Sequence, residues 1–271
     1  MVKEDNDTFT ICDYELRVQD YQQILLWAGQ LDIDPEQVIE RLEDSELEIF
    51  EEENLKFKVR GSAIVTLVWD FELLPLDKFE WMEELSISTI GLKNGKAIER
   101  ISFSLPALRK LYCSENQIRV LDLQNAPELL LLDCSDNYLK ELELSSTTKL
   151  EILRCSTNEI KALDTSNLKN LEELNFSDNI GIEIPDFSAT SRLTHLACSS
   201  LALKTLNLKE VKNLKYLDCH NNKLSVLDLN STTSLTWLDC KNNSLTSIEL
   251  SSLTKLAGLD CRKNQLSSLV L

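Results

Sequence analysis

The main pattern in the chain is a set of apolar positions that recurs at a fixed interval from Leu108 to Leu271. The copies follow the pattern LxxLxCxxNxLxxLxL with a few substitutions, and one copy is longer than the others by a single residue. A period within roughly 20–29 residues, with leucines in this frame, is typical of a solenoid in which every copy supplies one strand to a single parallel sheet. The pattern therefore predicts an α/β solenoid. Its eight copies, the last of them partial, begin at Leu108, Leu129, Leu150, Leu171, Leu193, Leu214, Leu235 and Leu256.

Positions within a copy are counted from its first leucine. Positions 1 to 8 alternate apolar and polar residues, which is the period of a half-buried strand. In the sixth copy, Leu217 and Cys219 are expected to point into the core, and we expect the residues between and beside them to point outward: Tyr216, Asp218 and His220. Outward residues, at positions 3, 5 and 7, should line the concave side of the solenoid. Since no copy can bury its apolar face alone, stacking of neighbouring copies has to stabilise the fold.

Position 9 is an asparagine in seven of the eight copies. The chain leaves the strand and turns at this point, so backbone N–H and C=O groups lose their ladder partners. A side-chain amide donates and accepts at once, and it can satisfy such groups in its own copy and in the adjacent one. We therefore assign this column to structure rather than to ligand binding. It consists of Asn116, Asn137, Asn158, Asn179, Asn222, Asn243 and Asn264.

Position 6 is a cysteine in seven copies, and these cysteines are expected to be reduced and buried. Equivalent side chains of neighbouring parallel strands are about 4.8 Å apart and point the same way, whereas bridged Cβ atoms are about 3.5–4.5 Å apart. A straight row of ligands also cannot surround a tetrahedral zinc ion. Seven free thiols fit a reducing compartment. The column leaves out Cys12 and consists of Cys113, Cys134, Cys155, Cys198, Cys219, Cys240 and Cys261.

The clearest copies, at 214–222 and 235–243, have the form LxxLDCxxN. They resemble the repeats of bacterial leucine-rich-repeat proteins, in particular those of the internalin-like group. The resemblance covers residues 108–271. It implies a leucine-rich-repeat stack that serves as a protein-binding scaffold, with no catalytic residue in the repeats. A fold of this kind does not identify the partner.

Residues 1–80 precede the repeats and are predicted to form a small acidic α+β cap module, in which residues 1–12 are loosely held. Apolar residues at helical spacing predict a helix that begins near Asp20 and ends at Gly29. Its apolar face should consist of Tyr21, Ile24, Leu25 and Ala28. A second helix is predicted from residues suited to an N-cap, a first turn and a capping box, followed by an apolar face: Asp34, Pro35, Gln37, Val38, Ile39 and Leu42.

Strands should follow these helices. Apolar residues alternate between 47 and 59 on both sides of the acidic run 51–54, which predicts a hairpin with an acidic tip. The run 64–69 predicts a more buried strand. The leucine frame appears in degraded form within 81–107, which we interpret as one irregular repeat at the start of the solenoid, because terminal repeats of such stacks are atypical.

The chain has a net charge of −17, of which residues 1–107 carry −14 and residues 108–271 carry −3. Nucleic acids and anionic membranes attract basic proteins, so neither is an expected partner. Two short helices also occur in helix-turn-helix DNA-binding proteins, but segment 20–53 contains one basic residue, Arg41. A protein with a basic surface would be steered toward the acidic N-terminal part, although the acidity also serves solubility.

The chain begins without an apolar signal core, and it contains no apolar run long enough to span a bilayer. A soluble, cytoplasmic protein is therefore expected. Leaderless secretion into a host, or earlier removal of a signal peptide, would leave the same sequence.

Few residues suggest chemistry. The two histidines, His195 and His220, each lie near a column cysteine, but strand geometry puts the thiol and the imidazole on opposite faces of the sheet. There is no phosphate-binding glycine loop and no HExxH motif, so neither an enzyme nor a cofactor is predicted. The outward column Asp218, Asp239 and Asp260 could hold a cation, but Asp belongs to the repeated frame. No metal site is predicted.

The outward positions of the later copies carry the specific information. Tyr216 and Trp237 are large aromatic residues at outward strand positions, flanked by charges of both signs, which is typical of the energetic centre of a protein interface. The predicted function is a non-catalytic scaffold that binds a protein on its concave face. The alternative is the substrate-recognition or regulatory region of a larger enzyme or secreted bacterial effector. The predicted site consists of Arg154, His195, Tyr216, Asp218, His220, Trp237, Asp239, Lys241 and Asp260.

Two irregularities interrupt the pattern. In the fourth and fifth copies Phe176 replaces the column cysteine, an extra residue enters near 181–185, and Leu201 replaces the column asparagine. Because Phe is much larger than Cys, we expect a local change of curvature there. The last copy stops at its sixteenth position, Leu271, without a polar capping segment. Either a further segment or another chain should cover that edge, and end-to-end self-association is one way to do so.

Overall fold

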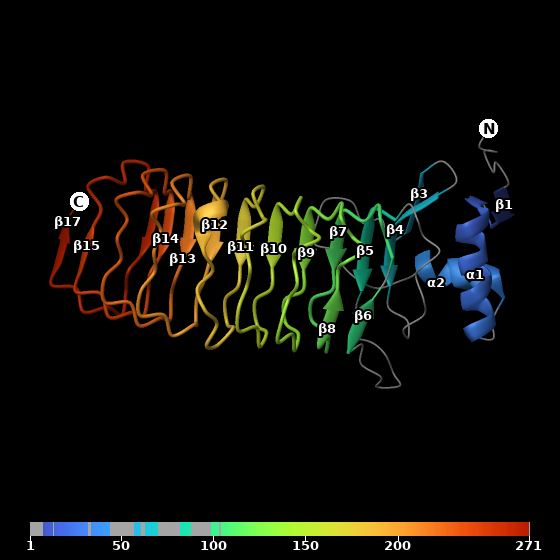
Figure 1. Ribbon diagram of the computed structural model, residues 1–271, viewed down its shortest axis with the longest axis horizontal. Coiled ribbons are helices and arrows are strands. Elements are labelled where there is room, and N and C mark those ends of the chain that lie inside the picture. Colours follow the sequence, from blue (N-terminus) through green and yellow to red (C-terminus); the bar gives the residue numbers. More distant parts are fainter. Residues whose placement is uncertain are drawn as a thin grey trace.

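The computed structural model describes residues 8–12, 14–31, 34–43, 57–60, 63–69, 82–87, 99–102 and 104–270. Its dominant element is a sheet of 11 strands that runs along the long axis of the molecule (Figure 1). Each of the eight copies supplies one short strand, at positions 3 to 5. These strands are β7 (Lys110–Tyr112), β9 (Leu131–Asp133), β10 (Ile152–Arg154), β11 (Glu173–Asn175), β12 (His195–Ala197), β13 (Tyr216–Asp218), β14 (Trp237–Asp239) and β16 (Gly258–Asp260).

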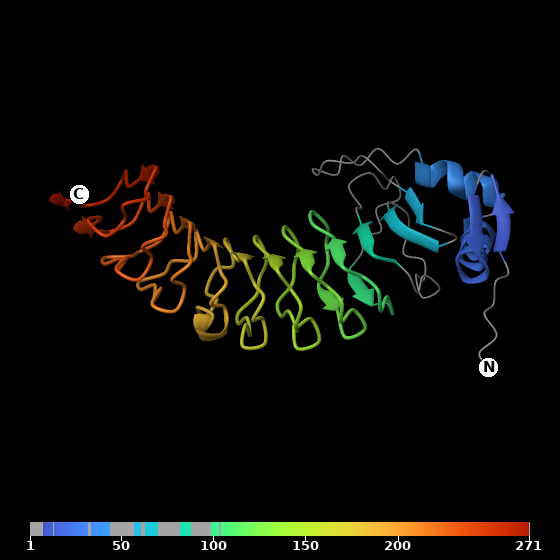
Figure 2. The same ribbon diagram turned by 90° about the horizontal axis from the view of Figure 1, so that it is seen from above.

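Neighbouring copies pair in parallel, with residues at the same copy position opposite each other. Leu174 of β11 pairs with Leu196 of β12, for example, and Leu217 of β13 pairs with Leu238 of β14. All four leucines are fully buried. Figure 2 shows the strands on the inner side of a curved stack, with the return segments on the outer side. The predicted solenoid with one parallel sheet on its concave side is therefore confirmed.

The sheet extends beyond the first regular copy toward the N-terminus. β5 (Glu84–Ile87) pairs in parallel with β7 and places Leu85 opposite Leu111. Both leucines are fully buried, so Leu85 occupies the core position that a leucine occupies in every regular copy. β5 lies within the segment 81–107 that the sequence assigned to an irregular repeat. The exact boundaries of that repeat stay a prediction.

The N-terminal edge of the sheet is a hairpin of β3 (Phe57–Arg60) and β4 (Ala63–Trp69). β4 confirms the predicted strand at 64–69, and it also pairs in parallel with β5. The acidic tip at 51–54 and the predicted first arm of its hairpin lie outside the described residues. In the described part of the chain β3 pairs instead with the strand that follows it. Apolar alternation indicates that a segment is a strand without indicating its partner.

The chain starts with a second hairpin, of β1 (Thr8–Ile11) and β2 (Tyr14–Arg17). The expectation that residues 1–12 are loosely held is therefore wrong for 8–12. Ile11 and Leu16 are buried against α1 (Val18–Leu31), which stabilises two strands too short to attract notice in the sequence.

Both predicted helices are present, α1 and α2 (Pro35–Glu43), and they pack against each other beside the N-terminal end of the sheet (Figure 1). α1 begins before Asp20 and continues through Gly29 to Leu31, so Gly29 does not end it. Its buried face includes Trp27, whereas Leu25 is 42% exposed, contrary to the prediction. No helix in the described ranges has the length and hydropathy needed to cross a membrane.

The half of the predicted capping box that Gln37 supplies is present in α2. The Oε1 atom of Gln37 accepts a hydrogen bond of 3.0 Å from the backbone N–H of Asp34, and the N–H of Gln37 donates to the carbonyl of Asp34. Val38 and Ile39 are buried, as predicted. The side chain of Leu42 lies outside the described residues.

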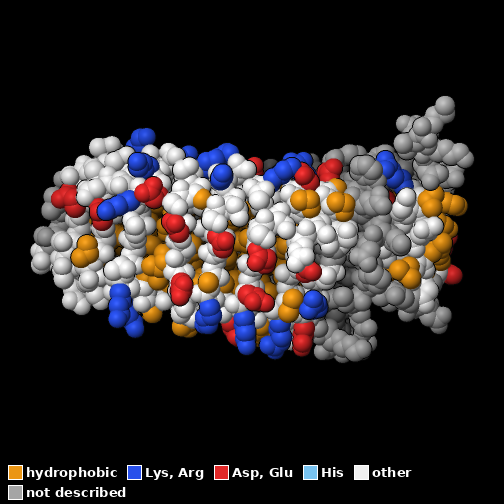
Figure 3. Space-filling view, in the orientation of Figure 1, with side chains coloured by type: hydrophobic (Ala, Val, Ile, Leu, Met, Phe, Trp, Pro, Cys, Tyr) orange, Lys and Arg blue, Asp and Glu red, His pale blue; other side chains and the backbone are white. Residues whose placement is uncertain are grey.

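The return side carries two small parallel pairs of strands: β6 (Arg100–Ser102) with β8 (Val120–Asp122), and β15 (Ser247–Glu249) with β17 (Ser268–Val270). Between them, a column of polar residues at position 15 holds the turns. The carboxylates of Glu143, Asp164 and Asp228 each accept the backbone N–H two residues further on, at 2.9–3.1 Å. Acidic side chains form a central band on the face shown in Figure 3, with Lys and Arg side chains along its margins.

The asparagine column is a hydrogen-bonded ladder, as predicted. The Nδ2 atom of Asn137 donates to the carbonyls of Cys113, Cys134 and Ser135 at 2.9–3.1 Å. Its Oδ1 atom accepts the backbone N–H of Ile118 at 2.9 Å. Asn137 thus links its own copy to the preceding copy, and the same pattern recurs at Asn158, Asn179, Asn222, Asn243 and Asn264.

The irregular copies keep the sheet register. Phe176 is fully buried, and β11 pairs with both of its neighbours without a shift. The extra residue is accommodated on the return side, where Gly181 has a positive φ of 81° and a short helix, η1 (Phe187–Ala189), follows. Asn222 makes an additional bond to the copy that lacks the asparagine, because its Oδ1 atom accepts the N–H groups of both Leu201 and Leu203. A change of curvature near Phe176 stays a prediction.

Candidate binding face

The position-3 residues of the last four copies form a row across the concave sheet: His195, Tyr216, Trp237 and Gly258 are neighbours in register. The rings of His195 and Tyr216 are stacked, with centroids 5.9 Å apart and an interplanar angle of 24°. Trp237 is 46% exposed, which makes it one of the large apolar side chains that the described part of the chain presents to solvent. The predicted site residues His195, Tyr216 and Trp237 are therefore adjacent, on one surface.

Gly258 is needed in this row for space. A Cβ atom built on it would lie 2.0 Å from Cε3 and 2.2 Å from Cζ3 of Trp237, so the indole lies against the backbone of β16. A side chain at position 258 would therefore have to displace the ring. Sequence reasoning missed this role, although the signal was available: position 3 reads Trp in one copy and Gly in the next.

The aspartates at position 5 have a structural role in addition to any binding role. Oδ1 of Asp218, of Asp239 and of Asp260 accepts the backbone N–H of the residue at position 7 of the same copy, at 2.9–3.1 Å. Asp133 and Asn175 in earlier copies make the same bond. The bond closes the turn that follows the strand, which explains why Asp recurs in the frame.

Two of the three aspartates are also paired with a side chain of their own copy. Oδ1 of Asp218 is 2.5 Å from Nδ1 of His220. The guanidinium of Arg262 donates to both carboxylate oxygens of Asp260, at 2.9 and 2.6 Å, which lowers the pKa of Asp260 to about 2. Asp239 differs, because no Lys, Arg or His nitrogen of the described residues lies within 4.0 Å of its carboxylate.

Asp218, His220 and Asp239 each offer one possible metal-ligand atom, and these atoms lie within 4.8 Å of one another. An imidazole with two carboxylates would suit a transition-metal ion such as Zn²⁺. Partly exposed acidic groups nevertheless often occur together without a metal. The sequence-based expectation that the chain has no metal site stays a prediction.

The predicted site residues do not all lie together on the sheet. Arg154 lies on β10, two strands from β12, and its guanidinium is taken up by Glu173 at 2.7 Å and Asp133 at 3.9 Å. It is therefore apart from the aromatic row.

Partial burial, and then the charges of Asp218 and Asp239, raise the pKa of the Tyr216 hydroxyl. Asp260, by contrast, lies on β16, which pairs with the strand of Trp237, and Lys241 follows that strand by two residues.

No protein-family model matches the chain. No curated protein matches it either. Among solved structures, the functional domain of InlJ from Listeria monocytogenes, described as including a cysteine ladder, is 30% identical. The TM-score is 0.63, and the match covers 77% of this chain and 44% of that chain. InlF, an internalin of Listeria monocytogenes, is 22% identical with a TM-score of 0.56 over 72% of this chain and 58% of that one. Toll from Drosophila, in the Toll–Spatzle complex, is 21% identical, with a TM-score of 0.56. That match covers 75% of this chain and 35% of the Toll chain.

InlJ is described as including a cysteine ladder, and this chain likewise has a column of cysteines along its sheet. The chain has the fold of an internalin-like leucine-rich-repeat protein. It spans less than half the length of the InlJ chain that it matches, and less than two thirds of InlF.

The internalin-like repeats hold their cysteines as a row of free thiols, as predicted. Six of the seven are buried and Cys261, in the last copy, is partly buried. Burial raises the pKa of the Cys198 and Cys219 thiols well above its usual range, so they stay protonated. His195 lies on the exposed face, and no Cys–His nucleophile pair is formed in the described part of the chain.

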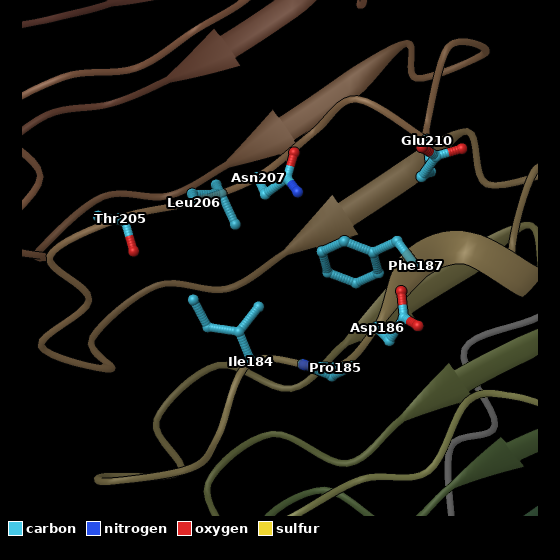
Figure 4. Close-up of a pocket in the computed structure, with 8 residues that line it drawn as sticks. All are labelled: Ile184, Pro185, Asp186, Phe187, Thr205, Leu206, Asn207 and Glu210. Atoms are coloured by element: carbon cyan, nitrogen blue, oxygen red, sulfur yellow. The ribbon is translucent and has the colours of Figure 1, made fainter.

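One hollow of the internalin-like stack was not expected from the sequence. It lies on the return side, next to η1, and has a volume of about 310 Å³. Figure 4 shows Ile184, Phe187 and Leu206 directed toward one space, with Asp186 and Glu210 on one side of it. The hollow results from the extra residue of the fourth copy. Its walls place no set of polar groups around a common point, so it is a weaker candidate than the concave row.

Proposed function

We propose that the protein is a non-catalytic scaffold that binds a partner protein through the concave face of its last copies, with Trp237 and Tyr216 as anchors. The single observation that supports this best is the exposed indole of Trp237, which β16 holds in place through Gly258. A large apolar side chain at an outward sheet position costs solubility. It is consistent with a role in binding.

Physical properties of the face support the proposal. The anchors lie on neighbouring strands of a continuous sheet, so a partner can dock without first ordering a loop. Polar groups follow both anchors along their own copies: Asp218 and His220 after Tyr216, and Asp239 and Lys241 after Trp237. Aromatic anchors within a polar rim dominate the binding energy of many protein interfaces.

The comparisons support the class of function. Leucine-rich-repeat neighbours are interaction modules, and Toll is found in a complex with Spatzle. At 21% identity this similarity concerns the fold alone, so the partner of this chain is not inferred from it. A partner with a basic surface stays a prediction, as do the exclusion of nucleic acid and end-to-end association.

The test uses the full chain as immobilised bait in three forms: wild type, Trp237→Ala and Val226→Ala. Val226 is 71% exposed and lies outside the sheet, so its truncation removes apolar surface from a different place. We expect Trp237→Ala to weaken binding of the captured partner by at least about 2 kcal/mol, with thermal stability nearly unchanged. Equal capture by all three forms would refute concave-face binding. Loss of capture by Val226→Ala alone would assign binding to the return side.

A further inference from the structure

Asp239 occupies a special place among the carboxylates of the concave face. It lies between Asp218, which is bonded to His220, and Asp260, which is bonded to Arg262. Oδ1 of Asp239 accepts the backbone N–H of Lys241 at 2.9 Å, which uses one oxygen. The other oxygen has no bonded cation among the described residues. Asp239 is therefore the carboxylate of this column that can accept an incoming cation without breaking an ion pair.

The aromatic residues lie next to this carboxylate. Trp237 and Asp239 are two residues apart on β14, so their side chains project from the same face of the sheet. Tyr216 is directly opposite Trp237 on β13. One face of the indole packs against Gly258 of β16, so β16 does not cover the opposite face of the ring. An exposed indole face beside a carboxylate is the combination that attracts a guanidinium, through cation–π attraction and paired hydrogen bonds.

We propose that Trp237, Tyr216 and Asp239 form a receptor for an arginine side chain of the partner protein. The guanidinium stacks on the indole and donates hydrogen bonds to Asp239. Arginine fits better than lysine, because its planar group can stack and form a bidentate bond at the same time. This inference rests on the proposed function and specifies the chemistry of the partner at that site.

Positive charges near Asp239 affect how strongly it can bind a cation. Lys241 follows Asp239 on the same face, and the charge of Arg262 is close enough to be felt by Asp239, although Asp260 binds that guanidinium. The positive charge of Lys241, two residues from Asp239 on the same face, repels an incoming cation. Its removal should strengthen arginine binding, whereas it would weaken the binding of an anion.

The experiment titrates N-acetyl-arginine amide into the full, ¹⁵N-labelled chain in the presence of EDTA. The indole N–H signal of Trp237, assigned by its loss in Trp237→Ala, reports the occupancy. N-acetyl-citrulline amide is the neutral probe of the same shape. We expect citrulline to bind about tenfold more weakly, because it lacks the charge that Asp239 and the indole recognise.

Asp239→Asn tests the carboxylate without removing the turn, because the Asn oxygen can still accept the N–H of Lys241. We expect it to weaken arginine binding about tenfold. Asp228→Asn is the matched control, since Asp228 accepts a backbone N–H at 3.1 Å in the same way on the return side. That control should change nothing. Lys241→Ala should strengthen binding about two- to threefold.

Three results would overturn the inference: equal binding of citrulline, no effect of Asp239→Asn, or weaker binding in Lys241→Ala. Binding that appears only when Zn²⁺ replaces EDTA would also overturn it and assign Asp218, His220 and Asp239 to a metal ion. If arginine fails to bind while capture still depends on Trp237, the proposed function stands and this inference falls. If arginine binds but Trp237→Ala captures the partner normally, the proposed function falls.

Discussion

The first five copies and the last three share one backbone but present different outward faces. At position 7 the first five copies have serine throughout, and Ser135, Ser177 and Ser199 are buried. The last three have His220, Lys241 and Arg262 at that position, beside three aspartates at position 5. Inward, the two groups share the leucine frame, the cysteine column and the asparagine ladder, apart from the substitutions at Phe176 and Leu201.

This difference separates the residues that the fold requires from those that it permits. An acceptor at position 5 closes the turn after the strand in five copies, and Asp133 and Asn175 provide it as well as the aspartates of the last three copies do. The fold does not require a basic residue at position 7 or an indole at position 3, because the first five copies manage without them. The distinctive residues of the last three copies are therefore available for binding.

The largest expected effect is a fall in unfolding free energy at high pH, and it tests whether the first five and the last three copies share one core. Burial raises the pKa of Cys155, from the first group, and that of Cys240, from the last, to about 12. Unfolded thiols ionise at about pH 8.5, so the unfolded state loses protons first as the pH rises. The stabilisation is complete below about pH 8.5 and is lost as the pH rises to about 12. Each thiol should contribute about 1.4 kcal/mol per pH unit to the fall in unfolding free energy.

Urea unfolding at several pH values from roughly 8 to 11, within the window of thiol ionisation, would measure this slope. Cys155→Ala and Cys240→Ala should each reduce it by one thiol's share. Comparing slopes removes the constant cost of the cavity that each substitution leaves. A reduction in one variant and not in the other would show that the two groups differ in their cores.

The next effect concerns the asparagine ladder at the boundary between the groups. Asn222→Ala should destabilise by about 3 kcal/mol, because it leaves the N–H groups of Leu201 and Leu203 unpaired. Asn137→Ala, which orphans the N–H of Ile118 alone, should cost about 2 kcal/mol. Chemical unfolding measures both. If Asn222→Ala costs no more than Asn137→Ala, the second bond, to the N–H of Leu201, does not add to the stability.

Gly258→Ala tests whether the last copies hold Trp237 in place. The added Cβ would displace the indole, so we expect partner capture to fall about tenfold, with a stability loss of at most about 1 kcal/mol. The indole N–H signal should shift at the same time. Gly29→Ala is the control, since a Cβ there meets nothing within 4 Å. Normal capture by Gly258→Ala would mean that the position of the ring is unimportant.

The smallest effect is a gain in stability. Position 8 has a left-handed backbone in every copy, and the last group uses Asn221 and Asn242 there, whereas Thr157 of the first group has a φ of 53°. A β-branched residue is strained in this region and asparagine is tolerated. Thr157→Asn should stabilise by about 0.5–1 kcal/mol, measured by chemical unfolding. No gain would show that the side chain of Thr157 offsets its own strain.

The repetitive part of the fold could be predicted from the sequence because its period also sets the register. Once Leu217 and Leu238 are known to be equivalent, their pairing follows, and so do the cysteine and asparagine columns. The N-terminal part lacks such a period. The β1–β2 hairpin and the partner of β3 depend on tertiary contacts, which apolar alternation does not encode.

The candidate site, too, was predicted only in part. The row from His195 to Trp237 followed from copy positions alone. A role for Arg154 in binding stays a prediction: it lies two strands from His195, as its copy position implies, whereas its ion pair with Glu173 depends on side-chain conformation and could not be read from the register. Gly258 was missed because its importance comes from the neighbour's ring, and the hollow at η1 was missed because it results from how the extra residue folds.

The hydrogen bonds of the asparagine ladder have a consequence for how such a protein can change over time. Every rung joins one copy to the copy before it through the same atoms, so a gene that duplicates or loses one whole copy preserves each type of bond. Removing 129–149, for instance, would bring Asn158 into the place of Asn137 beside Cys113. The stack would become one strand shorter, far from Trp237. Length and recognition can therefore be inherited independently of each other.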